Sequence, residues 1–172
     1  MTGNTAPAPK RAGSLERVRA YLARRGLDGG LIAFDDRSTK TCELAAEAVG
    51  CEVGQIVKSL VFVADGRPVL ALVAGDRKGD AAAIGALTEA RSVKFANAEE
   101  VRASTGYAIG GVSPYDLPGE LTVLIDDSLE RFDTVYTAAG TPASMVRIPR
   151  STLFALTGGR VARISRSDSD HV

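Results

Sequence analysis

The sequence predicts an α+β domain organised around a buried β-hairpin. Residues 54–64 and 67–76 form two apolar, β-branched runs on either side of Asp65-Gly66, a dipeptide that supplies the positive φ angles of a tight turn. Patterns of about eight short strands and five helices are interspersed along the chain, with no internal repeat. A mixture of hairpins and short crossovers is typical of an α+β fold.

Length and composition indicate one domain. The 172 residues, 45% hydrophobic and 24% charged, can bury one substantial core. Residues 1–13 are rich in Pro, Ala, Gly and Thr, and residues 166–172 are polar, so both segments are expected to be disordered tails. We expect a single globular domain over residues 14–165.

The elements before the hairpin follow from helical spacing and caps. A first helix is expected between Ser14, a suitable N-cap, and Gly26. Apolar side chains recur on it at helical spacing: Leu15, Val18, Tyr21 and Leu22. Residues 31–34 predict a short strand, and residues 38–49 predict a second helix closed by Gly50.

Strands and helices alternate after the hairpin as well. The alanines at 79–87 and the acidic first turn of 98–104 favour helices, and a last helix is expected at 149–156. Short apolar runs predict the remaining strands, at 93–96, 121–125, 134–138, 146–148 and 161–164.

Lys58 is an unusual residue for its strand. A strand has a two-residue period, so Lys58 shares a face with Ile56 and Leu60, and neither face of this strand has a polar pattern. Burial of an unpaired ammonium is costly, so Lys58 must reach solvent, pair with a carboxylate, or face a cleft where a ligand supplies negative charge. A solvated lysine is the commoner arrangement, and the cleft is the functional hypothesis.

The second informative stretch is the glycine-rich segment 105–115. Gly106, Gly110, Gly111 and Pro114 allow backbone amides to approach a ligand closely and fix an irregular turn. The segment lacks the lysine and hydroxyl spacing of a phosphate-binding P-loop. By itself it predicts a turn that is able to line a site.

Charge and residue types argue against several classes of function. Twenty-one basic and 21 acidic residues cancel, so no overall field attracts DNA or an anionic membrane. The one histidine, His171, lies in the C-terminal tail, and Cys42 and Cys51 form no CxxC motif, so we expect no metal site, no cofactor and no histidine-based catalysis. No apolar run is long enough to span a membrane and no signal peptide is evident, so the cytoplasm is the expected location.

Four segments resemble the YbaK and prolyl-tRNA synthetase-associated editing domains. They are Gln-Ile-Val-Lys-Ser-Leu-Val-Phe at 55–62, Thr-Gly-Tyr-Ala-Ile-Gly-Gly-Val-Ser-Pro at 105–114, Leu-Ile-Asp-Asp-Ser-Leu at 124–129 and Ala-Ala-Gly-Thr at 138–141. The resemblance covers roughly residues 30–165 in the family's order and spacing. It implies a mixed, largely antiparallel sheet that curls into a barrel-like domain with surrounding helices. It also implies a trans-editing deacylase that hydrolyses the ester of a mischarged tRNA, such as tRNA-Pro carrying Ala, Cys or Ser.

The resemblance implies a site built around the strand lysine and the glycine loop. Lys58 would stabilise charge that develops at the ester, and backbone amides of Gly110 and Gly111 would position the carbonyl, so these three are the expected catalytic residues. The expected substrate-binding residues are Thr41, Ser59, Ser113, Pro114, Gly140 and Ser144. The acceptor end of the tRNA is the expected partner, and prolyl-tRNA synthetase is a further candidate partner. The oligomeric state is not predicted.

The chain differs from the family's cysteine-specific members on either side of Gly140. Those members carry a serine before this turn and an aspartate after it, where this chain has Ala138 and Met145. The difference argues against specificity for cysteinyl-tRNA and leaves alanine, serine and threonine as alternatives. Ser144 is interpreted as a surface turn residue, with a substitute hydroxyl as the alternative. A non-catalytic aminoacyl-tRNA or effector-binding module, or a hydrolase of another small ester, is compatible with the same scaffold.

Overall fold

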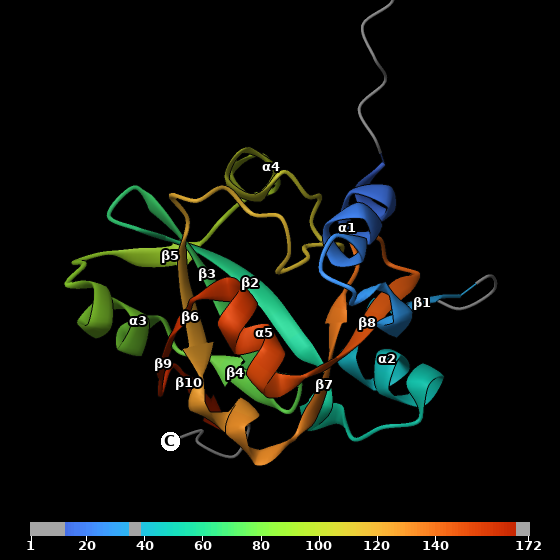
Figure 1. Ribbon diagram of the computed structural model, residues 1–172. Helices are drawn as coiled ribbons and strands as arrows, with labels where there is room; N and C mark the ends of the chain where they lie inside the picture. The colour runs from blue at the N-terminus through green and yellow to red at the C-terminus, as the bar shows by residue number, and fades with distance from the viewer. Residues whose placement is uncertain (1–12, 35–38, 168–172) are drawn as a thin grey trace, which may run out of the picture.

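A computed structural model describes residues 13–34 and 39–167 (Figure 1). The helices in these ranges are α1 (Ser14–Ala23), α2 (Cys42–Val49), α3 (Ala81–Thr88), α4 (Ala98–Thr105) and α5 (Arg150–Thr157). The strands are β1 (Leu31–Ala33), β2 (Val57–Ala64), β3 (Arg67–Ala74), β4 (Arg77–Gly79), β5 (Val93–Phe95), β6 (Thr122–Asp126), β7 (Thr134–Ala138), β8 (Ser144–Pro149), β9 (Arg160–Ala162) and β10 (Ser165–Ser167). Three short 3-10 helices complete the described elements, at Asp28–Gly30, Val53–Gln55 and Asp127–Arg131.

The β2–β3 hairpin lies at the centre of the fold, as predicted. Asp65 and Gly66 have φ angles of 47° and 80°, which suit a tight two-residue turn between Ala64 and Arg67. The Asp65 carboxylate also accepts hydrogen bonds of 2.9 Å from the backbone N–H groups of Arg91 and Ser92, and these bonds lower its pKa. The turn therefore fixes both the hairpin and the entry to β5.

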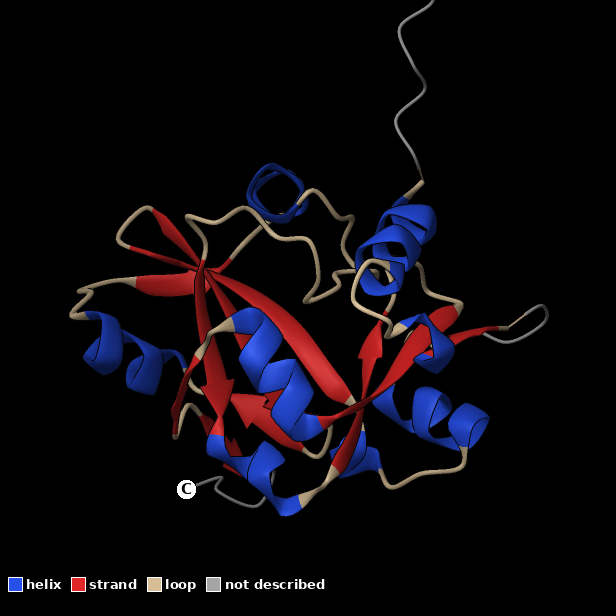
Figure 2. Cartoon of the chain, viewed as in Figure 1, coloured by secondary structure: helices blue, strands red, loops and turns tan. Residues whose placement is uncertain are grey.

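The strands form a mixed and largely antiparallel arrangement. The five-stranded sheet has the order β5-β2-β3-β6-β9, and β1-β8-β7 and β10-β4 form two smaller sheets. Only β3–β6 and β6–β9 are parallel among the seven strand pairs of the described residues. The strands cross the centre of the molecule and the helices lie around them (Figure 2). The described part of the five-stranded sheet ends at β5 and β9 without closing on itself, so the barrel-like expectation is not confirmed.

Both faces of the hairpin are covered, as its apolar runs predict. Val57, Val61 and Leu70 face one core, which Val18 of α1 and Leu153 of α5 complete. The alternate positions face a second core, which Ile84 of α3 completes; they include Phe62, Val69, Ala71 and Val73. The β2–β3 hairpin is thus fixed between layers, and its register is fixed with it.

The polar strands β4 and β10 differ from the sequence-based expectation. Residues 166 and 167 were expected to begin the polar tail, but together with Ser165 they form β10, which pairs antiparallel with β4. The buried Asp126 carboxylate holds this region, because it accepts hydrogen bonds from the Ile164 N–H at 2.8 Å and from the Ser165 hydroxyl at 2.7 Å. Residues 1–12 and 168–172 of the expected tails, and residue 38 of the expected second helix, lie outside the described residues.

Candidate active site

A cavity of about 370 Å³ lies along one edge of β2. Six segments line it: the start of α2 with the residues that lead into it, strand β2, the end of β5, helix α4, the glycine loop and the β7–β8 turn. β2 pairs with β3 over its whole length but with β5 only from Phe62 to Ala64. The stretch of β2 before Phe62 therefore faces the cavity instead of a neighbouring strand.

Backbone polar groups of β2 point into this open stretch. The Val61 carbonyl points away from β3, because it accepts a 3.0 Å hydrogen bond from the Ala96 N–H on the β5 side. Val63 has the same direction, since it lies opposite Pro68, which has no N–H to donate to it. Backbone groups alternate in direction along an antiparallel strand, so those of Ser59 also point away from β3. The Ser59 hydroxyl is buried and has no hydrogen-bond partner among the described residues. Ser59 therefore offers unpaired donors and acceptors at the cavity.

Lys58 lines the cavity from the same strand. Its side chain is half-buried, and its ammonium donates a hydrogen bond to the backbone oxygen of Arg77 on β4. The ionisable side chains on the described walls are Lys40, Lys58 and the Cys42 thiol, with no carboxylate and no histidine among them. The chain as a whole has a net charge of zero, so this positive cavity is a local feature suited to an anionic ligand.

Two buried tyrosines hold the glycine loop in place. The Tyr107 hydroxyl donates to the Tyr115 carbonyl at 2.6 Å, and the hydroxyls of Tyr115 and Thr137 on β7 lie 2.9 Å apart. Between these anchors, Gly110 is exposed, has a φ of +88° and lines the cavity. Its N–H makes no hydrogen bond within the described residues, whereas the Gly111 N–H donates to Ala108 at 3.0 Å. The loop thus offers the Gly110 amide to a ligand, and the Gly111 amide belongs to the turn.

Backbone-to-backbone packing places the loop against the β7–β8 turn and α1. A Cβ on Gly111 would lie 2.7 Å from the Gly140 oxygen, and a Cβ on Gly140 would lie 2.8 Å from the Ser14 oxygen. The positive φ angles belong to Gly110 and Gly140, so Gly111 is required for close approach and not for its backbone angle.

The structure brings five of the nine expected site residues to the cavity wall. These are Thr41, Lys58, Ser59, Gly110 and Ser144. The other four, Gly111, Ser113, Pro114 and Gly140, are not among the lining residues, and Ser113 is fully buried. The Thr41 hydroxyl is used as the N-cap of α2, where it accepts from the Leu44 N–H at 3.1 Å.

Ser144, interpreted from the sequence as a surface turn residue, is instead a buried residue of β8. Its exposed fraction is 1%, and its hydroxyl lies 2.6 Å from that of Thr141. Ala138 and Met145 face each other across β7 and β8, and both line the cavity. Met145, 3% exposed, packs with Ala45 and Ile56. This end of the cavity therefore has an apolar wall beside one hydroxyl pair.

Sequence reasoning missed several lining residues, including Lys40, Phe95, Ile109 and Thr141. Thr141 could have been found, because it lies in the Ala-Ala-Gly-Thr segment. Cys42 also lines the cavity, and burial raises the pKa of its thiol although the nearby Lys58 charge acts in the opposite direction. Burial likewise raises the pKa of Cys51. Both thiols are therefore protonated at neutral pH and are poor nucleophiles.

The loop anchor predicts a pH dependence of stability. Burial raises the pKa of Tyr107 to about 12, whereas an unfolded tyrosine titrates near about 10. Folding favours the neutral phenol of Tyr107. Its contribution to the free energy of unfolding is therefore complete below about pH 10 and is lost as the pH rises toward 12. We expect the free energy of unfolding, measured with urea, to fall over this window by up to about 1.4 kcal/mol per pH unit from this group. Tyr107→Phe should show a smaller fall, and identical pH profiles would contradict the assignment.

Comparisons with known proteins agree with this geometry. The family profile described as "Aminoacyl-tRNA editing domain" matches residues 36–155. The "Uncharacterized protein YwhH" of Bacillus subtilis is 33% identical over 149 residues, which cover 86% of this chain and 94% of the relative. The "Putative Cys-tRNA(Pro)/Cys-tRNA(Cys) deacylase EbsC" of Enterococcus faecalis is 25% identical over 129 residues, covering 74% of this chain and 79% of the relative.

A solved structure has the same fold. It is described as the "Crystal structure of a putative trans-editing enzyme for prolyl tRNA synthetase", and it superposes with a TM-score of 0.81 at 39% identity. The match covers 91% of this chain and 99% of the other.

None of the helices in the described ranges has the length and apolar character needed to cross a membrane.

Proposed function

Because the chain belongs to the aminoacyl-tRNA editing domain family, we propose that it is a trans-editing deacylase that hydrolyses the ester of mischarged tRNA-Pro carrying a small amino acid. The observation that carries the proposal is the composition of the cavity: two lysines, an unpaired glycine amide and an open strand edge, with no carboxylate or histidine on the described walls. Such a site suits the phosphate-bearing acceptor end of a tRNA, which we propose as the partner. Prolyl-tRNA synthetase is a further proposed partner, and the cytoplasm is the proposed location.

We propose a part of the substrate for each group on the walls. Lys58 and Gly110 both line the cavity. In the proposed complex the ester carbonyl lies between them, and the Lys58 ammonium and the Gly110 N–H stabilise the developing oxyanion. The α-ammonium of the amino acid needs an acceptor. Because the described walls carry no carboxylate, the proposed acceptor is a backbone carbonyl of the open β2 edge, such as that of Ser59.

Hydrolysis then needs no protein nucleophile. A water oxygen bonds to the ester carbon, the bond from that carbon to the ribose oxygen breaks, and the ribose oxygen takes the proton that the water gives up. The neighbouring ribose hydroxyl can relay this proton, because it lies beside the leaving oxygen in every aminoacyl-tRNA. The protein contributes position and charge stabilisation.

The apolar wall favours alanine among the small amino acids. Ala138 and Met145 contribute methyl and thioether groups to the cavity wall, and the hydroxyls of Thr141 and Ser144 bond each other. In the proposed complex the amino acid side chain lies against this wall. A hydroxyl or thiol would lose its hydrogen bonds to water against this wall, whereas a methyl group would lose none.

A deacylation panel tests the proposal. The purified protein is mixed with tRNA-Pro charged with Ala, Cys, Ser or the correct Pro, and the remaining ester is measured over time. We expect fast loss of alanine, slower loss of Cys and Ser, and no loss of Pro above the spontaneous rate. If every ester survives while the protein still binds the tRNA, the chain is a binding module and the proposal is wrong.

The cysteines should be dispensable for this reaction. Burial keeps the pKa values of the Cys42 and Cys51 thiols raised, so neither is a good nucleophile at neutral pH. We expect a Cys42→Ser, Cys51→Ser double variant to keep its rate within a factor of about three, as serine differs little in volume from cysteine. Mass spectrometry during turnover should detect no acyl-enzyme. A trapped acyl group on either cysteine of the parent would contradict the mechanism.

A further inference from the structure

Two large apolar side chains lie exposed on the wall of the cavity. Phe95 of β5 is 63% exposed and Ile109 of the glycine loop is 58% exposed, the highest values among the large hydrophobic residues that the structure describes. Single exposed hydrophobic residues are common on protein surfaces. These two come from separate segments and line the same cavity as Lys58. Their convergence calls for a ligand with an apolar part.

The Phe95 ring is held in position from behind. Phe95 pairs with Phe62 in the β2–β5 ladder, and their rings stack with centroids 4.5 Å apart and an interplanar angle of 29°. Phe62 is itself fully buried. One face of the Phe95 ring is therefore covered by a fixed neighbour, and the opposite face is available to a planar group at a small cost in side-chain entropy.

The charges of the cavity indicate what that planar group is attached to. Lys40 and Lys58 lie on the same walls, and no described lining residue is acidic. An aromatic side chain of a peptide would need the apolar surface but not the lysines. A nucleotide needs both, since it joins a flat base to a phosphate.

We propose that Phe95, supported by Ile109, stacks the adenine of the 3′-terminal adenosine to which the amino acid is esterified. This inference rests on the proposed function, because that function places the acceptor end in the cavity. The base then lies at the β5 side of the cavity, and the ester lies between Lys58 and Gly110. Stacking holds the ribose in register with these groups and does not depend on the identity of the amino acid.

Binding of uncharged RNA tests the proposal independently of hydrolysis. The probe is a fluorescent RNA hairpin with the tRNA-Pro acceptor stem and its single-stranded 3′ end, made once with the terminal adenine and once with an abasic terminal nucleotide. Kd is measured by anisotropy at fixed salt for the parent, Phe95→Ala, Phe95→Leu and Phe95→Tyr. Val161→Ala is the matched control, because Val161 is 40% exposed and lies outside the cavity wall.

The two RNAs separate stacking from other contacts. We expect Phe95→Ala to weaken binding of the adenine-ended RNA by roughly 5- to 150-fold, the usual range for loss of a base–aromatic stack, and to leave binding of the abasic RNA unchanged. Phe95→Leu should lose most of the same affinity, Phe95→Tyr should keep it, and Val161→Ala should have no effect.

Several outcomes would overturn the stacking role. They are equal weakening of both RNAs by Phe95→Ala, no weakening of either, full affinity in Phe95→Leu, or no measurable binding of the adenine-ended RNA by the parent. Thermal unfolding checks that each variant is folded. If Phe95→Ala does not fold, Phe95→Leu provides the same test. If the parent hydrolyses no ester, but Phe95→Ala weakens binding of the adenine-ended RNA and not of the abasic RNA, the proposed function is refuted and this inference is supported.

Discussion

Replacing Lys58 with alanine should lower kcat/KM for mischarged tRNA by roughly 10²- to 10³-fold, about 3–4 kcal/mol of transition-state stabilisation, the range seen when one preorganised donor is removed. The other cation on the described cavity wall is Lys40, which lies on a different segment, before α2. Stability should change little. The variant loses the hydrogen bond from Lys58 to Arg77 but also removes a half-buried charge from an apolar strand, so we expect a change in unfolding free energy below about 1 kcal/mol.

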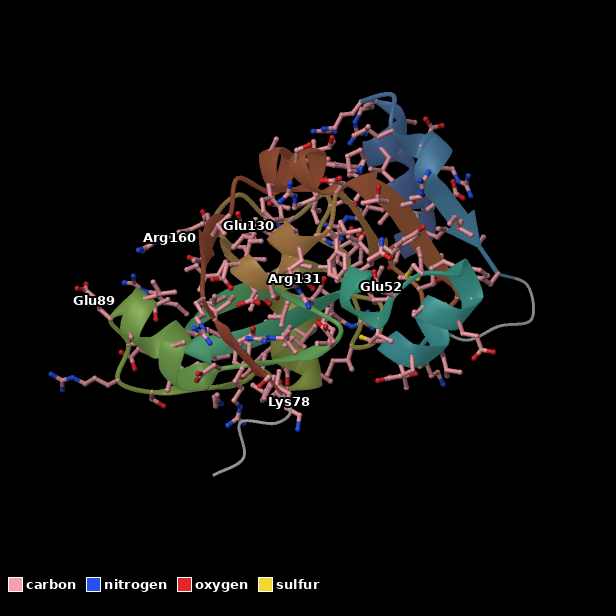
Figure 3. The ribbon with its side chains drawn as sticks, turned by 90° about the horizontal axis from the view of Figure 1, so that it is seen from below. Glu52, Lys78, Glu89, Glu130, Arg131 and Arg160 are labelled. Carbon is pink, nitrogen blue, oxygen red and sulfur yellow. The ribbon has the colours of Figure 1, made fainter. Side chains whose placement is uncertain are left out.

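Lys78→Ala is the matched control for Lys58→Ala. Lys78 lies on the neighbouring strand β4 at the edge of the molecule, as Figure 3 shows, and is not part of the cavity wall. Both variants lose one positive charge, so a general electrostatic effect on tRNA binding would appear in both. The proposed role predicts a large loss of rate for Lys58→Ala only. Equal rates for Lys58→Ala and the parent, at matched folded fractions, would falsify it.

Replacing Gly111 with valine should abolish measurable deacylation and destabilise the protein by about 1–3 kcal/mol, as overpacking usually does. A Cβ at this position would lie 2.7 Å from the Gly140 oxygen and 3.2 Å from the Thr141 nitrogen, both backbone atoms that cannot rotate away. The glycine loop must therefore move relative to the β7–β8 turn. That movement shifts the neighbouring Gly110, whose amide is expected to face the substrate.

Gly119→Val controls for the general cost of replacing a loop glycine. Gly119 is exposed, and a Cβ there would meet nothing within 4 Å. Unfolding by urea and deacylation are measured for both variants. If Gly111→Val keeps full activity, the loop is only a turn and its expected role in the site is wrong.

Local sequence signals predicted the centre of the fold well. Asp65-Gly66 and the runs beside it predicted the hairpin, because turn geometry and β-branched residues act over short distances. The strand period similarly predicted that Lys58 lies on a covered face. The short strands β4 and β10 were missed, since their polar residues carry no pattern and their pairing depends on the distant Asp126.

The residues of the cavity wall were predicted in part, for the same reason. The resemblance pointed to Lys58 and Gly110, which lie within compact motifs. It also pointed to Gly111, but the physical reason for that glycine is contact with Gly140, a residue of another segment that no local pattern reveals. The open edge of β2 was not predictable, because it depends on where pairing with β5 ends. Phe95 was missed because a single aromatic in a short strand gives no sign of its exposure.

The contact of Ser14 with Gly140 has a consequence for synthesis of the protein. The chain is synthesised from its N-terminus, so α1 and the β2–β3 hairpin emerge from the ribosome before β7 and β8. Until the Gly140 turn emerges, Ser14 at the start of α1 lacks its backbone contact with Gly140, and the cavity lacks one wall. A nascent chain that stops short of this turn should therefore be open to proteases and inactive. Completion of the last third of the chain should bring folding and binding of the acceptor end together in one step.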